Sequence, residues 1–300
     1  MYNKSDKRVI IIGGSGLIGR KLIKILSEKE VKTISTCNKN FYNDLIPYDL
    51  TKDDISKISK NFKSYDIFII LSAVSNPNWI ADNKDVAFNI NVTSTRRLID
   101  QIISTGAKIF FMSSVEVFDG KINKNLESTT PNPLNYYGYT KFEIEKYLKN
   151  NYNNYCIIRT GWNVGIDDRS RCVIKLTYET LIKDNAKMAT DNSFTITHVE
   201  DLAVSISKIL FTYDKNIVHL CCPKIIYRNE LADMIKKFSK YEKKMNYKSA
   251  KFEEILYSEK RALKNNLDSE YLNLNRDYKF RNVELTVKEK VEFLDKIYDL

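Results

Sequence analysis

Short apolar runs alternate with segments of helical periodicity along the first 160 residues, and this alternation restricts the fold more than any other feature. The apolar runs are "KRVIIIGG" (7–14), "VKTISTC" (31–37), "YDIFIILSA" (65–73), "AKIFFMSS" (107–114) and "NYCIIRT" (154–160). The third run is apolar without interruption from Ile67 to Leu71, which is typical of a strand that helices cover on both faces. Strands that alternate with helices predict a doubly wound parallel sheet with right-handed crossovers.

The intervening segments and the second half of the chain complete the expected order. Helices are predicted over residues 16–30, 81–105 and 136–150. After about residue 160 the pattern becomes irregular, and the predicted elements are strands at 193–198 and 216–222 and helices at 199–211, 228–239 and 280–300. We therefore predict an α/β fold with a sheet domain at 1–160 and a smaller mixed lobe at 161–300, interleaved and with an approximate boundary.

Composition and charge exclude several classes of protein. Of the 300 residues, 43% are hydrophobic and 29% charged, so the chain can bury a large core and is not disordered. The net charge of +10 comes from Lys and Arg interspersed with acidic residues, which favours anionic small molecules over nucleic acid or reflects a general Lys- and Asn-rich composition. Five cysteines without a CxxC pair predict a reducing compartment. We find neither a signal peptide nor a membrane span, and expect a cytoplasmic protein.

Three glycines follow the first predicted strand and open the first predicted helix. Gly13, Gly16 and Gly19 are spaced G-x-x-G-x-x-G. Glycine at these positions lets the turn close, lets a phosphate approach the backbone and lets the helix pack on the strand, while the helix N-terminus offers N–H groups to a pyrophosphate. The context predicts dinucleotide binding, and with it a Rossmann-type sheet in residues 1–160.

The end of the second predicted strand bears on the choice of dinucleotide. Thr36, Cys37, Asn38 and Lys39 stand where an acidic residue would bind a ribose 2′-hydroxyl. A cation in place of a carboxylate favours a 2′-phosphate, hence NADP(H), and Arg20 is a second candidate for that phosphate. The alternative is that Lys39 is a solvated loop lysine, so NAD(H) stays open.

The stretch "NYYGYTKFEIEKYL" (135–148) places a tyrosine one helical turn before a lysine. Tyr137 and Lys141 then lie on the same face of the predicted helix. We expect the ammonium of Lys141 to lower the pKa of Tyr137 from its usual value of about 10, so that the phenol exchanges a proton with a carbonyl or alcohol oxygen. The alternative is a surface helix that carries both residues without a catalytic role.

Other polar residues are weaker candidates. Trp162 and Asn163 follow a predicted strand, where ligands of such sheets bind, although Trp162 also suits a core position. Arg169, Arg171 and Arg261 are candidates for binding a diphosphate, or else are surface cations. The only histidines, His198 and His219, do not predict a metal site, and His219 suits a hydrogen-bonded core position. Asp201 is expected near a helix start, where the helix dipole favours a carboxylate.

Taken together, these motifs resemble an extended short-chain dehydrogenase/reductase, and within that family the dTDP-4-dehydrorhamnose reductase branch of sugar-nucleotide reductases. The resemblance covers nearly the whole chain. The matching segments are "GGSGLIG", "PYDLTKDD", "LSAVSNP", "NVTSTRRLI", "MSSVEVFDG", "YYGYTK", "IIRTGWNVG", "ITHVEDLA" and "RALKNNLDSEYL". Ala262 departs from the family pattern, which has a proline after the arginine at this point.

The resemblance implies a role for each matched residue. Ser114 would hydrogen-bond the same substrate oxygen as Tyr137, and Lys141 would also bind the nicotinamide ribose. Trp162, Asn163 and Arg261 would border the substrate. The implied cofactor-binding residues are Gly13, Ser15, Gly16, Leu17, Ile18, Gly19, Asn38, Lys39, Asp49, Leu50, Leu71, Ser72, Ala73, Asn91, Tyr137 and Lys141.

The predicted function is NAD(P)H-dependent reduction of a keto group on a nucleotide-activated sugar, with Tyr137 as proton donor and a homodimer allowed. Glu116 keeps a 4,6-dehydratase or epimerase open, because such dehydratases resemble this stretch and carry a proton-abstracting Glu two residues after the Ser. Val115 replaces the Asp that often precedes that Glu and cannot protonate a leaving hydroxyl. A third hypothesis is a non-catalytic NADP-binding regulatory subunit, since one subunit of methionine adenosyltransferase has this fold.

The sequence after the second strand predicts a cofactor preference. Titration of the purified protein with NADPH and with NADH should show tighter binding of NADPH, because Lys39 stands where NAD-binding proteins have a carboxylate. Equal affinities, or a preference for NADH, would show that Lys39 points away from the ribose.

Overall fold

The computed structural model describes residues 7–38, 44–167, 172–183, 185–275 and 277–298. Its main sheet is parallel throughout and has seven strands in the order β10-β6-β5-β4-β1-β2-β3. The strands are β1 (Val9–Ile12), β2 (Thr33–Cys37), β3 (Ile46–Pro47), β4 (Ile67–Ile70), β5 (Lys108–Met112), β6 (Tyr155–Arg159) and β10 (Ile217–His219). Strand order reverses direction between β1 and β4, so the predicted Rossmann-type sheet is confirmed, with its switch point beside the glycine loop.

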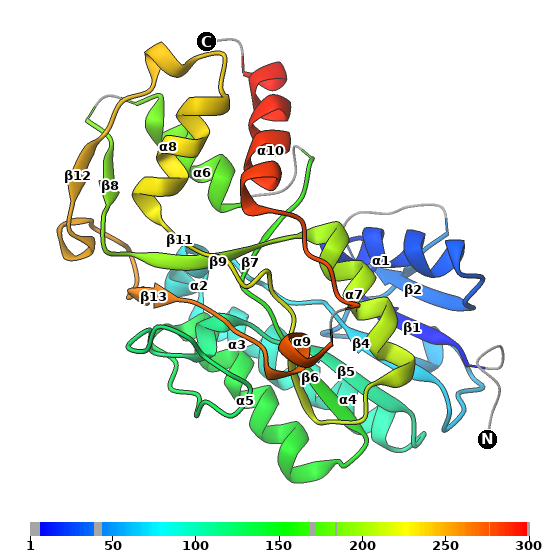
Figure 1. Cartoon of the computed structure of the whole chain (residues 1–300). Helices are drawn as coiled ribbons and strands as arrows, with labels where there is room; N and C mark the ends of the chain where they lie inside the picture. The colour runs from blue at the N-terminus through cyan, green and yellow to red at the C-terminus, as the bar shows by residue number, and fades with distance from the viewer. Residues whose placement is uncertain (1–6, 39–43, 168–171, 184, 276, 299–300) are drawn as a thin grey trace.

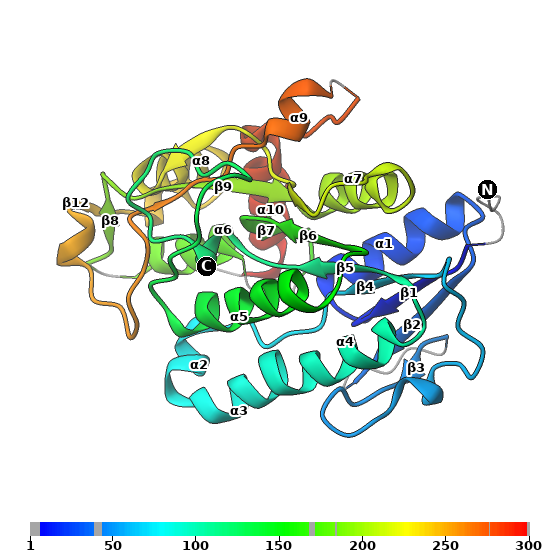
Figure 2. The same cartoon turned by 90° about the horizontal axis from the view of Figure 1, so that it is seen from below.

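Helices cover both faces of this sheet (Figures 1 and 2). Alternate strand residues point to opposite faces. On β1, Val9 and Ile11 pack in the core that includes buried residues of α1 (Leu17–Glu28) and α7 (Val199–Thr212). Ile10 and Ile12 pack in the opposite core, with α4 (Thr95–Ile103) and α5 (Tyr136–Asn151). Burial on both faces explains why the sheet strands appear in the sequence as continuous apolar runs.

The helix predicted over residues 81–105 is wrong as a single element. The segment forms α2 (Pro77–Asp82), α3 (Lys84–Phe88), a π-helical turn (Asn89–Ser94) and α4. The wide π turn holds Asn91, whose side chain accepts from the Val74 N–H at 2.9 Å and donates to the Val74 carbonyl at 2.8 Å. Hydrogen bonds to the loop after β4 therefore accompany the departure from a regular helix, as is common for π turns near functional sites.

The rest of the chain builds a second, smaller group of elements, which lies above the main sheet in Figure 1. One sheet contains β7 (Trp162–Val164), β9 (Ser193–His198), β11 (Ile225–Tyr227) and β13 (Lys264–Asn265), and β8 (Lys187–Ala189) pairs with β12 (Lys248–Ala250). The helices of this group are α6 (Val173–Leu181), α8 (Arg228–Phe238) and α10 (Val283–Ile297), whereas α9 (Glu270–Leu274) packs against β10 of the main sheet. Short 3₁₀ turns are η2 (Ile55–Lys57), η4 (Val115–Val117), η5 (Glu242–Lys244) and η6 (Phe252–Glu254).

The two groups of elements are interleaved in the sequence. Residues 216–222, predicted as an irregular late strand, contribute β10 to the main sheet, where it pairs with β6. Helix α7 packs against α1 rather than within the smaller group. The predicted division at residue 160 stays a prediction.

Two further observations concern the expected compartment. All five cysteines lie within the described residues, where each is buried and free. Among the helices of the described part of the chain, none is long and apolar enough to cross a membrane.

Candidate functional site

A cavity of about 380 Å³ opens at the carboxyl ends of the central strands, where Rossmann-type sheets bind ligands. Four separate sequence motifs meet around it: the glycine loop, the stretch after β4, the end of β5 and the first turns of α5. Predicted site residues in its lining are Gly13, Gly16, Leu17, Ile18, Gly19, Leu71, Ala73, Ser114, Glu116, Tyr137, Lys141, Trp162 and Asn163.

The glycine loop has the geometry that a pyrophosphate needs. Gly13 has φ +95°, a conformation that L side chains rarely adopt, and a Cβ there would lie 2.9 Å from the Ser72 nitrogen. A Cβ on Gly19 would lie 2.6 Å from the Gly13 carbonyl oxygen, so only glycine lets α1 pack this closely. Helix α1 begins without a side-chain cap and without an acidic residue in its first turn, which suits an anion at its N-terminus. A dinucleotide therefore fits this loop.

Other predicted cofactor residues lie outside the cavity lining: Ser15, Asn38, Asp49, Leu50, Ser72 and Asn91. The carboxylate of Asp49 accepts hydrogen bonds from the backbone N–H and hydroxyl of Thr51, at 2.9 and 2.7 Å, and these bonds lower its pKa. Leu50 is part of the core. Lys39, Arg169 and Arg171 lie outside the described residues.

Arg20, the second candidate for a 2′-phosphate, forms an ion pair with Asp167 at 2.6 Å. A phosphate would therefore compete with that carboxylate for the guanidinium.

The first turn of α5 is built directly onto η4. Asn135 caps α5, and its side-chain oxygen accepts from the Gly138 N–H at 2.8 Å. A Cβ on Gly138 would overlap the carbonyl oxygen of Glu116. Glycine at this position therefore allows the close approach that brings Tyr137 and Ser114 to the same cavity.

Tyr137 has a pKa above its ordinary value. Burial away from water is the main cause, the Glu116 carboxylate adds to it, and the Ser114 hydroxyl acts in the opposite direction. The expectation that Lys141 lowers this pKa is wrong for the arrangement seen here. The ammonium lies 5.9 Å from the centre of the Tyr137 ring and donates to the Met112 carbonyl at 2.8 Å. The phenol is therefore protonated at neutral pH, the state that a proton donor needs.

The pKa of Lys141 is shifted downwards, and burial is again the main cause. It is 4% exposed, and burial lowers the pKa of its ammonium from 10.5 to about 8, while Glu145 acts to raise it. Its charge at neutral pH is thus retained against a desolvation cost.

Glu116 lines the cavity but is held by two amides. One carboxylate oxygen accepts from the Asn135 side chain at 2.6 Å and the other from the Asn265 side chain at 3.0 Å. Asn265 belongs to β13, so the Glu116 carboxylate joins the catalytic helix to the second group of elements. Neither asparagine was predicted as a site residue, since a lone asparagine carries no local sequence signal.

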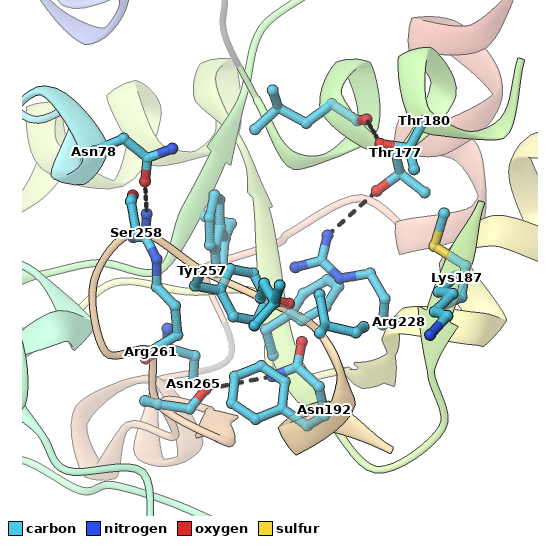
Figure 3. Close-up of a pocket in the computed structure, with 18 residues that line it drawn as sticks. Asn78, Thr177, Thr180, Lys187, Asn192, Arg228, Tyr257, Ser258, Arg261 and Asn265 are labelled. Atoms are coloured by element: carbon cyan, nitrogen blue, oxygen red, sulfur yellow. Dashed lines mark hydrogen bonds between the residues drawn. The ribbon is translucent and has the colours of Figure 1, made fainter. Parts of the chain in front are cut away.

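A second cavity has a volume of about 440 Å³ and contains Arg228 and Arg261 (Figure 3). Trp162 belongs to the lining of both cavities. Arg228 stacks its guanidinium over Phe194, 4.7 Å from the ring centre, and donates to the Thr177 hydroxyl at 3.2 Å. Arg261 enters from another side and donates to the Asn78 side-chain oxygen at 2.5 Å. Two guanidinium groups in one cavity suit an anionic ligand.

These two arginines have no acidic partner among the residues that the structure describes. Within the part of the chain that the structure describes, neither guanidinium forms an ion pair with a carboxylate. Burial lowers the pKa of Arg228, and the charge of Arg261 adds to that effect. The sequence had indicated Arg261 but not Arg228. One feature of the sequence could have indicated Arg228. It is the first residue of α8, and a helix N-terminus disfavours a cation unless an anion binds there.

The histidines and Asp201 have structural partners. His219 is fully buried, and its Nδ1 lies 2.9 Å from the Asp268 carbonyl, which confirms the predicted core position. Asp201 lies in the first turn of α7, as predicted, and pairs with Arg281 at 3.0 Å. Among the described residues, no cluster of three or more His, Cys, Asp or Glu is placed to hold a metal ion.

Comparison with known proteins assigns the whole fold to one family. Residues 7–295 match the family described as RmlD substrate binding domain. A dTDP-4-dehydrorhamnose reductase from Clostridium acetobutylicum is 26% identical, with a TM-score of 0.80 over 96% of this chain and 99% of that one. A dTDP-4-dehydrorhamnose reductase from Bacillus anthracis, solved in complex with NADP, is 24% identical, with a TM-score of 0.77 over 96% and 99% of the two chains, and shows the shared fold.

A curated relative carries a different name. Methionine adenosyltransferase 2 subunit beta from Bos taurus is 29% identical over 151 residues, which are 50% of this chain and 45% of that protein. The match thus spans about half the length of this relative.

The buried ammonium of Lys141 predicts a stability effect that depends on pH. Lys141→Met should raise the free energy of unfolding of the cofactor-free protein at pH 7 by about 1–3 kcal/mol, because the native state no longer buries a charge. The native pKa of about 8 lies below the ordinary 10.5, so the native lysine loses its charge first as the pH rises. The advantage of methionine should therefore shrink between pH 8 and pH 10.5.

Urea unfolding at pH 7 and pH 10 measures this difference, with Lys146→Met as the control for an exposed lysine on the same helix. A destabilised Lys141→Met protein at pH 7, or an effect of the same size at both pH values, contradicts the electrostatic account.

Proposed function

Because the chain belongs to the RmlD substrate binding domain family, we propose that it reduces a keto group on a nucleotide-activated sugar with NADPH. The observation that carries the proposal is the pairing of the two cavities. One is lined by Tyr137, Lys141 and the glycine loop, and the other holds Arg228 and Arg261, with Trp162 as their common wall.

The first cavity supplies the groups for proton transfer. NADPH, when bound, supplies the hydride. Tyr137 is protonated at neutral pH because burial and Glu116 raise its pKa, and it donates its proton to the carbonyl oxygen as the alcohol forms. Ser114 lies in the same lining and hydrogen-bonds that oxygen, which holds it within reach of the phenol. Lys141 lies in the same lining, 5.9 Å from the centre of the Tyr137 ring, and binds the nicotinamide ribose.

The second cavity supplies the groups for the nucleotide. Its two guanidinium groups bind the diphosphate, for which planar arginine side chains are well suited. Tyr257 and Phe252 provide aromatic surface for the base. A substrate that spans both cavities places its sugar beside Trp162, between the anion site and the proton donor.

Glu116 supports a second candidate, a dehydratase or epimerase, because its carboxylate lines the first cavity and acts on Tyr137. Both of its oxygens already accept hydrogen bonds, from the side-chain amides of Asn135 and Asn265, which hold the carboxylate in place. Val115 beside it offers no acid for a leaving hydroxyl. These contacts favour the reductase.

The named bovine relative supports a third candidate, a binding subunit without catalysis. That candidate retains NADP binding but predicts no turnover. Measured reduction of any keto sugar distinguishes it from the reductase.

A panel of 4-keto nucleotide sugars with NADPH, followed by absorbance at the nicotinamide band, tests the proposal. Tyr137→Phe keeps the ring and removes the proton donor, so turnover should fall by at least ~10²-fold while NADPH binding survives. Tyr139→Phe is the matched control, since Tyr139 lies on the same helix and is 39% exposed; its turnover should be normal. Near-normal turnover of Tyr137→Phe would remove Tyr137 from the acid role.

The same sugars without NADPH distinguish elimination from reduction. Loss of water from a 4-hydroxy nucleotide sugar, abolished by Glu116→Gln, would overturn the reductase proposal. Activity on keto sugars alone, with NADPH consumed in equal amount, would support it.

A further inference from the structure

A buried ion pair between Glu145 and Arg159 joins α5 to β6 and has no part in the chemistry described above. The Glu145 carboxylate and the Arg159 guanidinium form two hydrogen bonds, at 2.6 and 3.0 Å, and their side chains are only 4% and 2% exposed. Glu145 belongs to α5 and Arg159 ends β6. A pair buried this deeply carries a desolvation cost and is weak evidence for a stabilising role alone, so another role has to be considered.

Glu145 is connected to the candidate site in two ways. It lies one helical turn after Lys141, on the same face of α5. It also accepts a hydrogen bond from the Ser113 hydroxyl at 2.5 Å. Ser113 lines the first cavity next to Ser114, and this cavity is called the cofactor cavity below. The Glu145 carboxylate therefore lies one helical turn beyond Lys141 and is hydrogen-bonded to the residue before Ser114.

Arg159 is fixed from its other sides. Its guanidinium stacks over Phe118, 5.0 Å from the ring centre, and Nη1 lies 3.4 Å from Nε2 of His219. The Nδ1 atom of His219 lies against two carbonyl oxygens, so it carries the proton and leaves Nε2 to accept from Arg159. Burial lowers the pKa of His219, Glu127 acts to raise it and Arg159 lowers it further, so the ring stays neutral beside the guanidinium. Arg159 in turn pairs with the Glu145 carboxylate at 2.6 Å.

We propose that Glu145 is a positioning residue that maintains the charge of Lys141 from the next turn of α5. This inference rests on the proposed use of the cofactor cavity for NADPH. The Lys141 ammonium donates one hydrogen bond, to the Met112 carbonyl, and its remaining N–H groups are available to a ligand. Glu145 supplies the negative charge that offsets part of the desolvation of this ammonium.

The other charged or titratable groups around Lys141 do not take this role. Tyr137 on α5 is neutral at physiological pH, and Glu116 after β5 is held by Asn135 and Asn265. Arg159 on β6 is a cation, and His219 on β10 is neutral. Glu145 is the charged partner that raises the pKa of Lys141 against burial.

The affinity for NADPH as a function of pH, measured by nicotinamide fluorescence, tests this inference without turnover. Glu145→Gln keeps the size of the side chain and removes its charge, so Lys141 should lose its proton at lower pH. The loss of affinity on raising the pH, expected near pH 8 for the wild type, should move down by roughly one pH unit. Below that range the two affinities should agree within about twofold.

Glu143→Gln is the matched control, because Glu143 lies on the same helix and pairs instead with Arg96, at 2.8 Å. Its pH profile should equal that of the wild type. If Glu145→Gln does not fold, Glu145→Gln combined with Arg159→Gln removes the uncompensated guanidinium, and its profile should move in the same direction.

An unchanged pH profile in whichever of these variants folds would overturn the inference. A uniform loss of affinity at every pH would overturn it as well, since it would show a structural effect without a titration. Failure of the wild type itself to bind NADPH would instead contradict the proposed function, so the two failures are distinguishable.

Discussion

The geometry of the candidate site depends on the contact between the first turn of α5 and the backbone of Glu116. Gly138 has no Cβ, so the helix can lie against the Glu116 carbonyl. Asn135 caps the same turn with its side-chain oxygen and donates from its amide nitrogen to the Glu116 carboxylate. This single junction sets the position of Tyr137 relative to Ser114, and through Asn265 it joins the catalytic helix to the strand that borders the second cavity.

Burial in the same region of the molecule determines the protonation of the two central residues of the site. Burial makes the phenol of Tyr137 a weaker acid and the ammonium of Lys141 a weaker base, which holds the tyrosine protonated and brings the lysine close to titration. Two acidic side chains also act on these residues. Glu116 raises the pKa of the Tyr137 phenol, and Glu145 raises the pKa of the Lys141 ammonium. A site of this kind is maintained at the expense of stability, as is common for functional residues held away from water.

The sheet could be predicted because its strands are buried on both faces and therefore appear as continuous apolar runs, Ile67–Ile70 being the clearest. The π turn around Asn91 could not, since its side chain hydrogen-bonds to the backbone of Val74 in the loop after β4. Strands of two or three residues, such as β13, are too short to show alternation. The glycine loop and the Tyr–Lys pair were visible through their spacing, whereas Arg228 and Asn265 act only through partners far away in sequence.

The central claim is that one substrate spans two cavities with separate tasks, and Arg228→Gln tests it most directly. Calorimetric titration with a nucleoside-diphosphate sugar should show at least roughly tenfold weaker binding, because a partly buried guanidinium no longer meets the diphosphate. NADPH affinity should be unchanged, and Lys237→Gln, on α8 and paired with Glu284, should bind both ligands normally. Unaltered binding of the nucleotide sugar to Arg228→Gln, or a parallel loss of NADPH binding, would contradict the two-cavity account.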